Sequence, residues 1–296
     1  MKKILSYNLL IGFILFFLAG ASAQRVNINL RINENTEAIV FQNEAVLLDV
    51  AVFNKKAQAD NRWNQAGEER MKELDELLRQ GKIKQEDYDR EKASIEKSKR
   101  VPQSTELGSA TSSWTSAISW KVMNTANRNY VDIPVKLLKR PSTDGKAVLD
   151  ANGYYIACYG ISPEDMRSVG PGTYAIECVI NNIPSNAAVL KVENSTMDAA
   201  KENSEPVLLR TGQYYWHAEN GIKTVEYADR ILAKNPSSLD GLSLKGDGQL
   251  LQRSYQSAME TYNKAVIEYY KQNGANSEPP EYLLSMIDII RKELGQ

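Results

Sequence analysis

The stretch Val26-Asn27-Ile28-Asn29-Leu30-Arg31-Ile32 alternates strictly between apolar and polar side chains. A period of two residues places every apolar side chain on one face of an extended chain, so the stretch predicts a half-buried β-strand. Residues 45–53 follow as a second extended stretch, and this one is apolar on both faces. A strand of that kind is expected at the centre of a sheet, with both of its faces covered.

Further stretches of the same kind determine the fold class of the first two thirds of the chain. They lie at 115–122, 131–138, 154–160, 173–180 and 187–192. The turn-forming pairs Asp144-Gly145, Asn152-Gly153 and Pro171-Gly172 separate several of them. About seven short strands with no helix between most of them predict an antiparallel β-sandwich over residues 24–195.

The phrase Val169-Gly170-Pro171-Gly172-Thr173-Tyr174 leads directly into one of these strands. The stretch from Val26 to Phe53 opens with a strand, a short turn and a long apolar strand. In both respects the sequence resembles the immunoglobulin-like and macroglobulin-like β-sandwiches of extracellular proteins. The resemblance implies a sandwich of that class.

Residues 60–100 interrupt the strands with a highly charged, helix-forming insertion. Apolar residues recur there at helical spacing between Met71 and Leu78, and Gly81 stands where a C-terminal helix cap is expected. The phrase from Leu74 to Lys92 resembles the helical hairpins called SHOCT domains, which implies a small oligomerisation or docking module. The alternative is a solvated, salt-bridged pair of helices that decorates the sandwich. The narrow apolar stripe must pack against something for the helices to be stable.

After a polar linker at 194–205, helical spacing replaces alternation over residues 205–296. The clearest segment has Leu242, Gly246, Tyr255, Ala258, Tyr262 and Ala265 at the spacings of a tetratricopeptide repeat, which it resembles. Gly212 and Tyr215 mark a degenerate repeat upstream, in which Thr224 replaces the usual small residue. Pro279-Pro280 begins a last helix that is expected to cap the array. The resemblance implies a helical repeat domain with a concave surface that binds a peptide or protein.

The sequence offers little for catalysis. His217 is the only histidine, which nearly excludes Ser-His-Asp and Cys-His systems. No phosphate-binding loop, dinucleotide fingerprint or zinc-protease motif is present. Asp247 lies between two glycines like a fragment of a calcium loop, but the acidic ligands that should follow are missing. We therefore expect no enzyme, no cofactor and no metal site.

The N-terminus predicts export. Lys2 and Lys3 precede an apolar run at 9–18 and the small-residue site Ala21-Ser22-Ala23, so residues 1–23 are expected to be a cleavable signal peptide. No later stretch is long and apolar enough to span a membrane. The net charge of −1 becomes −3 without the two lysines, which is too balanced for nucleic-acid binding. The mature chain is therefore expected in the periplasm or outside the cell.

Cys158 and Cys178 are the only cysteines, and both lie in predicted strands. Export places them in an oxidising compartment, where a disulfide can persist. We expect a bridge between neighbouring or facing strands, with two free buried thiols as the alternative.

Together these features predict a non-catalytic exported protein that docks or scaffolds an envelope or extracellular protein. Aromatic density on the repeat scaffold suggests Tyr214, Trp216 and His217 as partner-binding residues. One alternative is a structural envelope component that forms homo-oligomers through the hairpin at 67–99. Another is a carbohydrate-binding protein that uses the sandwich aromatics Trp114, Trp120, Tyr154 and Tyr155.

Overall fold

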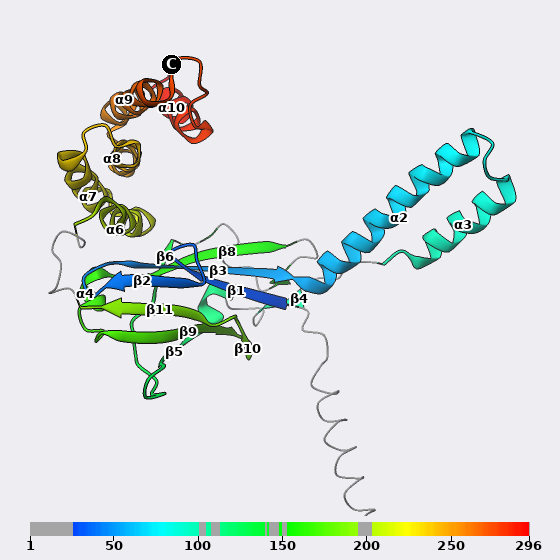
Figure 1. Cartoon of the computed structure of the whole chain (residues 1–296), viewed down its shortest axis with the longest axis horizontal. Coiled ribbons are helices and arrows are strands. Elements are labelled where there is room, and N and C mark those ends of the chain that lie inside the picture. Colours follow the sequence, from blue (N-terminus) through cyan, green and yellow to red (C-terminus); the bar gives the residue numbers. More distant parts are fainter. Residues whose placement is uncertain are drawn as a thin grey trace, which may run out of the picture.

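The computed structural model describes residues 26–100, 105–107, 113–139, 141, 148–149, 153–194 and 203–295. The predicted signal peptide at 1–23, the turn pair Asp144-Gly145 and most of the polar linker at 194–205 lie outside the described residues. The described chain combines antiparallel β-sheets with α-helices. One group of helices follows the sheets in sequence, and a separate helical hairpin projects from them (Figure 1).

The first sheet has the strand order β1-β3-β8-β6, and every pairing in it is antiparallel. Its strands are β1 (Val26–Ile32), β3 (Val46–Asn54), β8 (Tyr154–Ile161) and β6 (Lys136–Lys139). The two-sided apolar pattern of β3 correctly predicted a central strand, since β3 pairs with β1 on one side and β8 on the other. The predicted strand at 131–138 is shorter than expected, because only β6 pairs in the sheet.

The second sheet has the order β10-β9-β11-β2, and β5 pairs with β9 as well. Its strands are β2 (Glu37–Phe41), β5 (Ile118–Asn124), β9 (Gly172–Ile180), β10 (Ile183–Pro184) and β11 (Ala188–Glu193). The β2–β11 pairing is parallel. Short elements complete the sheet region: β4 (Thr105–Glu106), β7 (Val148–Leu149), the 3-10 turn η1 (Trp114–Ala117) and α4 (Pro163–Met166).

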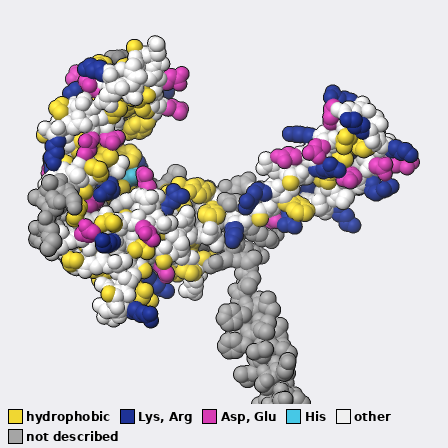
Figure 2. All heavy atoms as spheres, viewed as in Figure 1, with side chains coloured by type: hydrophobic (Ala, Val, Ile, Leu, Met, Phe, Trp, Pro, Cys, Tyr) yellow, Lys and Arg dark blue, Asp and Glu magenta, His cyan; other side chains and the backbone are white. Residues whose placement is uncertain are grey.

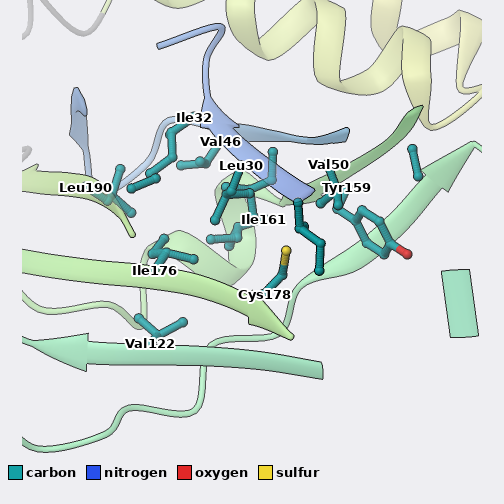
Figure 3. Close-up of a cluster of buried hydrophobic side chains, with 14 of the residues drawn as sticks. Leu30, Ile32, Val46, Val50, Val122, Tyr159, Ile161, Ile176, Cys178 and Leu190 are labelled. Atoms are coloured by element: carbon teal, nitrogen blue, oxygen red, sulfur yellow. The ribbon is translucent and has the colours of Figure 1, made fainter. Parts of the chain in front are cut away.

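One hydrophobic core joins the two sheets. Figure 3 shows Leu30 and Val50 of the first sheet in the same cluster of buried side chains as Ile176 and Leu190 of the second. These four side chains are completely buried. Because every second residue of these strands is apolar and faces the other sheet, a continuous apolar layer forms between them.

The structure contradicts the predicted disulfide, because both cysteines are free thiols. Successive residues of a strand face opposite sides of a sheet. Cys158 is partly exposed while its neighbours Ala157 and Tyr159 are buried in the core, so its sulfur lies on the outer face of the first sheet. Cys178 lies inside the core on β9 of the second sheet. The two side chains therefore occupy different faces of different sheets, and burial raises the pKa of Cys178 to about 11.

The helical insertion consists of α2 (Lys55–Arg79) and α3 (Gln85–Ser98). Strand β3 ends at Asn54 and α2 begins at the next residue, so no loop separates them. Gly81 has φ of 65°, and its N–H donates to the carbonyl of Leu78, which confirms the predicted C-cap. The hairpin points away from the sheets (Figure 1). Its helices pack chiefly on each other, with Leu74 buried and no buried residue in α3.

The helical region contains α6 (Glu205–His217), α7 (Gly221–Lys234), α8 (Leu239–Leu251), α9 (Tyr255–Asn273) and α10 (Glu281–Glu293). Consecutive helices pack side by side and form an arc beside the first sheet (Figure 1). A Cβ atom placed on Gly246 would lie 2.7 Å from the ring of Tyr262, so the close approach of α8 and α9 depends on this glycine. None of the helices among the described residues combines the length and the apolar character needed to cross a membrane.

Candidate functional site

Helix α6 packs on the outer face of the first sheet, and this contact creates the candidate site. Tyr214 of α6 is buried against Gly160 of β8, where an added Cβ atom would lie 2.7 Å from the tyrosine ring. Leu47 and Leu138 of the sheet belong to the same apolar cluster. The hydroxyl of Tyr215 donates to the Glu164 carboxylate at 3.2 Å. A side chain at position 160 would therefore displace the helix from the sheet.

A buried ion pair fixes the same helix. The Glu44 carboxylate is fully buried and accepts a hydrogen bond from Nε of Arg210 on α6 at 2.5 Å. The N–H of Phe41 donates to the other carboxylate oxygen at 3.2 Å. Burial raises the pKa of Glu44, and the Arg210 guanidinium offsets that effect in part. Because a buried carboxylate needs its partner, the pair ties α6 to one position on the sheet.

A cysteine, a histidine and an aspartate meet at this interface. Cys158 on β8 lies opposite Asp49 on β3, and the two side chains share a hydrogen bond. His217 of α6 lies close enough to interact electrostatically with Asp49. Burial raises the pKa of Cys158 and Asp49 and lowers that of His217. A nucleophilic cysteine needs the opposite shift toward a thiolate, so this arrangement does not activate the thiol.

A cavity of 540 Å³ opens beside the interface. Its walls come from α6, α8, the start of α10 and the turn that follows β1. Its lining residues include Leu209, Gln213, Trp216, His217, Asp240 and Ser243. A second cavity of 290 Å³ shares Glu34, Leu209, Gln213 and His217 with it, so we treat the two as one groove. Figure 2 shows a hollow between the helical arc and the sheets. The volume of the larger cavity by itself is within the range that is usual for ligand-binding sites.

The walls of the groove combine apolar and acidic side chains. Leu239, Leu244 and Leu283 supply apolar surface, and Glu34, Asp240 and Asp247 supply carboxylates. Asp247 accepts hydrogen bonds from the hydroxyls of Tyr262 and Tyr282, and burial raises its pKa. No lysine or arginine is among the described residues that line the larger cavity.

The structure separates the three predicted partner-binding residues. Trp216 and His217 line the groove, and their rings lie edge to face with centroids 4.7 Å apart. Tyr214 is buried between α6 and the first sheet, so it is not available to an external partner. The prediction was wrong for Tyr214 because the sequence does not show which face of α6 meets the sheet.

Sequence reasoning missed the acidic residues of the groove wall, which are Glu34, Asp240 and Asp247. Asp247, set aside as an incomplete calcium loop, lies in the groove wall. Glu34 sits at the centre of a tight turn with φ of 69°, beside Asn33 with φ of 47°. A polar Asn-Glu-Asn triplet straight after an alternating strand signals such a turn. Nothing in the sequence indicates that it faces the helical region.

The four aromatic residues considered for carbohydrate binding do not form one exposed platform. Trp114 and Tyr155 are buried in the core, whereas Tyr154 is 58% exposed. Trp120 packs partly buried against Tyr159, with ring centroids 5.2 Å apart. In the described part of the chain, no group of three histidine, cysteine or acidic side chains is arranged to hold a metal ion.

Comparison with known proteins gives little further information. No protein-family model matches the chain, and the search of curated proteins gave no match. Among solved structures, the chain is similar to a family 123 glycoside hydrolase from Clostridium perfringens, described in relation to glycolipid glycan hydrolysis. The identity is 8% and the TM-score is 0.29, over 92% of this chain and 46% of that enzyme. The chain thus spans about half the length of the enzyme, and so low a TM-score does not indicate a shared fold.

Proposed function

We propose that the chain is a non-catalytic exported protein that docks a segment of an envelope or extracellular protein in the groove. The observation that carries this proposal is the groove itself, a cavity of 540 Å³ between the sheets and the helical arc. Its apolar walls include Leu209, Leu239 and Leu244, and Gln213 adds an amide that can pair with a peptide backbone. Such walls suit an extended segment with apolar side chains.

We also propose that the two sheets form an immunoglobulin-like sandwich and that helices α6 to α10 form tetratricopeptide-like repeats. An immunoglobulin-like sandwich is supported by the hydroxyl of Tyr174, which donates to the carbonyl of Gly170 at 2.7 Å. Conserved tyrosines at strand corners of such domains make a similar hydrogen bond to the upstream backbone.

Tetratricopeptide-like repeats are supported by turn geometry. Glu219 after α6 and Arg253 after α8 have φ of 55° and 57°. They stand 34 positions apart, which is the length of a tetratricopeptide repeat. Helices α6, α8 and α10 are then the first helices of successive pairs, and these helices line the groove.

Export rests on the predicted signal peptide at 1–23, and it limits the partner to the periplasm, the cell surface or the surroundings of the cell. The docked partner on this proposal is therefore a protein of the envelope or the extracellular space. No cofactor or chemical step is part of the proposal.

Site-specific photocrosslinking tests the docking function. A benzophenone amino acid is placed at Ser243 in the groove of the mature protein, and at Lys264 on the exposed side of α9 in a matched control. Each protein is irradiated with the native envelope fraction. We expect a crosslinked partner at position 243 and none at position 264. Replacing Gln213 by Arg, which fills the groove without touching the interface core, should abolish the product.

Crosslinking at both positions alike, or a product that persists in the Gln213→Arg protein, would contradict docking in the groove. A product seen only when the probe is moved to the exposed hairpin residue Lys72 would transfer the docking role to that hairpin.

A second candidate function is self-assembly through the hairpin at 67–99. The observation that favours it is the position of α2 and α3, which project away from the sheets (Figure 1), together with the absence of any buried residue in α3. Light scattering on the mature protein, with and without residues 67–99 replaced by a Gly-Ser linker, measures this directly. An oligomer that dissociates in the deletion protein supports assembly, and an equal mass per particle in both proteins contradicts it.

A further inference from the structure

The groove carries an excess of negative charge. Glu34 reaches it from the turn after β1, Asp240 from the first turn of α8, and Asp247 from the middle of the same helix. Burial lowers the pKa of His217 below its usual value, so this wall residue is neutral at neutral pH. Arg210 borders the smaller cavity, but its guanidinium is held by Glu44. The carboxylates of the larger cavity therefore face the space without a lining lysine or arginine to balance them.

The surroundings of Asp247 favour a cation. Its carboxylate has lost much of its water, and desolvation is the main reason for its raised pKa. The hydroxyls of Tyr262 and Tyr282 hydrogen-bond to one of its oxygens. A positively charged group that enters the cavity is attracted by the Asp247 carboxylate. This Coulomb attraction is stronger than in bulk water because little water screens it.

The same walls contain aromatic rings. Trp216 and Tyr282 both line the larger cavity. An ammonium or guanidinium group over such a ring is attracted by the electrons of its face, and arginine also stacks on it. Carboxylates and aromatic rings around one space therefore favour the same kind of guest, a cationic side chain with an aliphatic stem.

Glu34 is held in place by its turn. Asn33 donates its N–H to the carbonyl of Leu47 at 2.9 Å, and the N–H of Leu47 donates back to the Asn33 side chain at 3.0 Å. The left-handed backbone conformation of Glu34 is unfavourable for a residue with a side chain, and these bonds to β3 maintain it. The turn after β1 thus fixes the backbone position from which Glu34 reaches the cavity that Asp240 and Asp247 of α8 also line.

We propose that the groove selects a protein segment that carries a lysine or arginine side chain, which it holds among the carboxylates of Glu34, Asp240 and Asp247. The leucines of the walls receive the apolar residues next to the cation. This inference rests on the proposed docking function and adds the chemistry of the docked segment.

Matched peptides test the selection. Three octapeptides with blocked ends share one sequence of glycine, serine and leucine and differ only at a central position, which is arginine, its neutral isostere citrulline, or glutamate. Binding to mature protein is measured by isothermal titration calorimetry. We expect the arginine peptide to bind about tenfold more tightly than the citrulline peptide, and the glutamate peptide most weakly. The preference should shrink as salt is added, because salt screens charges.

Two charge variants show where on the protein the preference for the arginine peptide arises. The double variant Glu34→Gln/Asp240→Asn removes two exposed carboxylates of the groove, and Glu69→Gln/Glu86→Gln removes two exposed carboxylates of the hairpin. Both change the net charge equally. We expect the groove variant to bind arginine and citrulline peptides with similar affinity, and the hairpin variant to keep the preference of the wild type.

Three results would overturn the inference. If the wild type binds the arginine and citrulline peptides with equal affinity, the groove does not select a cationic side chain, but the proposed docking function is not contradicted. A preference that survives in the Glu34→Gln/Asp240→Asn protein places the cation elsewhere. If none of the three peptides binds, the groove does not take short cationic segments, and crosslinking at position 243 decides separately whether it takes a protein partner.

Discussion

The helical region and the helical hairpin are both attached to the first sheet, but they are attached in opposite ways. Helix α6 lies on the sheet with Tyr214 buried against Gly160 and with the buried pair of Glu44 and Arg210 beside them. The hairpin continues from the end of β3 and points outward, and both basic and acidic side chains are spread over the face of it that Figure 2 shows. Its buried side chains among the described residues are Asp60 and Leu74.

This difference teaches what fixes the orientation of a helix on a sheet. Ion pairs such as Arg70–Glu73 on the hairpin are exposed, and exposed pairs contribute little to stability. The Glu44–Arg210 pair and the Tyr214–Gly160 contact cannot be separated without exposing or crowding buried groups. The position of the groove is therefore set by α6, whereas the hairpin is held mainly by its own helices and its junction with β3.

Removing an arginine from each attachment should give the largest contrast. In Arg210→Ala the buried Glu44 carboxylate loses its partner, and we expect the free energy of unfolding to fall by about 3 kcal/mol. In Arg70→Ala an exposed pair is lost, and we expect a fall of less than about 1 kcal/mol. Urea denaturation followed by circular dichroism measures both. Similar losses in the two proteins would show that burial does not distinguish the two attachments.

Adding one methyl group at a glycine of each attachment should give a smaller contrast of the same kind. Gly160→Ala crowds the ring of Tyr214, and we expect a loss of about 2 kcal/mol. In Gly67→Ala the new Cβ atom lies 3.2 Å from the end of the Ile95 side chain, which can yield, while alanine favours the helix. We therefore expect no loss in the hairpin variant. A stable Gly160→Ala protein with unchanged crosslinking at position 243 would contradict the role of this contact.

Acidification should weaken the attachment of α6 through His217. Its pKa is lowered from 6.5 mainly by burial, so the unfolded chain binds a proton more readily than the folded one. The stability that depends on neutral His217 is complete above pH 6.5 and is lost as the pH falls toward the lowered pKa. Between about pH 7.5 and about pH 5, wild type should lose more stability than His217→Gln.

The raised pKa values of Glu44 and Asp49 have the opposite effect on stability. These carboxyl groups bind a proton more readily in the folded chain than in the unfolded chain, so a fall in pH favours the folded chain. Both carboxylates remain in the His217→Gln protein, so the difference between the two denaturation series reports the titration of His217 together with its electrostatic coupling to Asp49. A difference that does not change with pH would show that His217 does not titrate differently in the folded chain.

The smallest effect on the rest of the molecule is expected for Leu74→Ala. The substitution empties the centre of the hairpin and should destabilise that hairpin by about 2 kcal/mol. Hydrogen exchange should then become faster in α2 and α3 while α6 and the sheets keep their protection. Faster exchange in α6 would show that the hairpin and the helical region unfold together.

Much of the architecture follows from periodicity in the sequence. Alternation located β1, β3, β8, β9 and β11 to within a few residues, and Gly81 marked the end of α2. Strand β2 was missed because Glu37–Phe41 is short and its partner β11 lies about 150 positions later. A five-residue stretch with one fully buried side chain, Val40, has too weak a pattern to stand out.

The candidate site was only partly predictable, because it depends on contacts between distant segments. Trp216 and His217 were identified from aromatic density, but Tyr214 was misplaced because its partner Gly160 lies in a strand of the other region. The expected disulfide failed for the same reason, since spacing along the chain does not show that Cys158 and Cys178 belong to different sheets. Glu34 and Asp247 line the same cavity only because α6 packs on the first sheet.

The direct passage from β3 into α2 has a mechanical consequence. Helix α2 has 25 residues, so it is a lever about 37 Å long. Its fulcrum is a central strand that is hydrogen-bonded on both sides, and the same strand carries Leu47 beneath α6 and Asp49 beside His217. A force applied at the tip of the hairpin is therefore transmitted to the strand whose residues Leu47 and Asp49 line the smaller cavity of the groove.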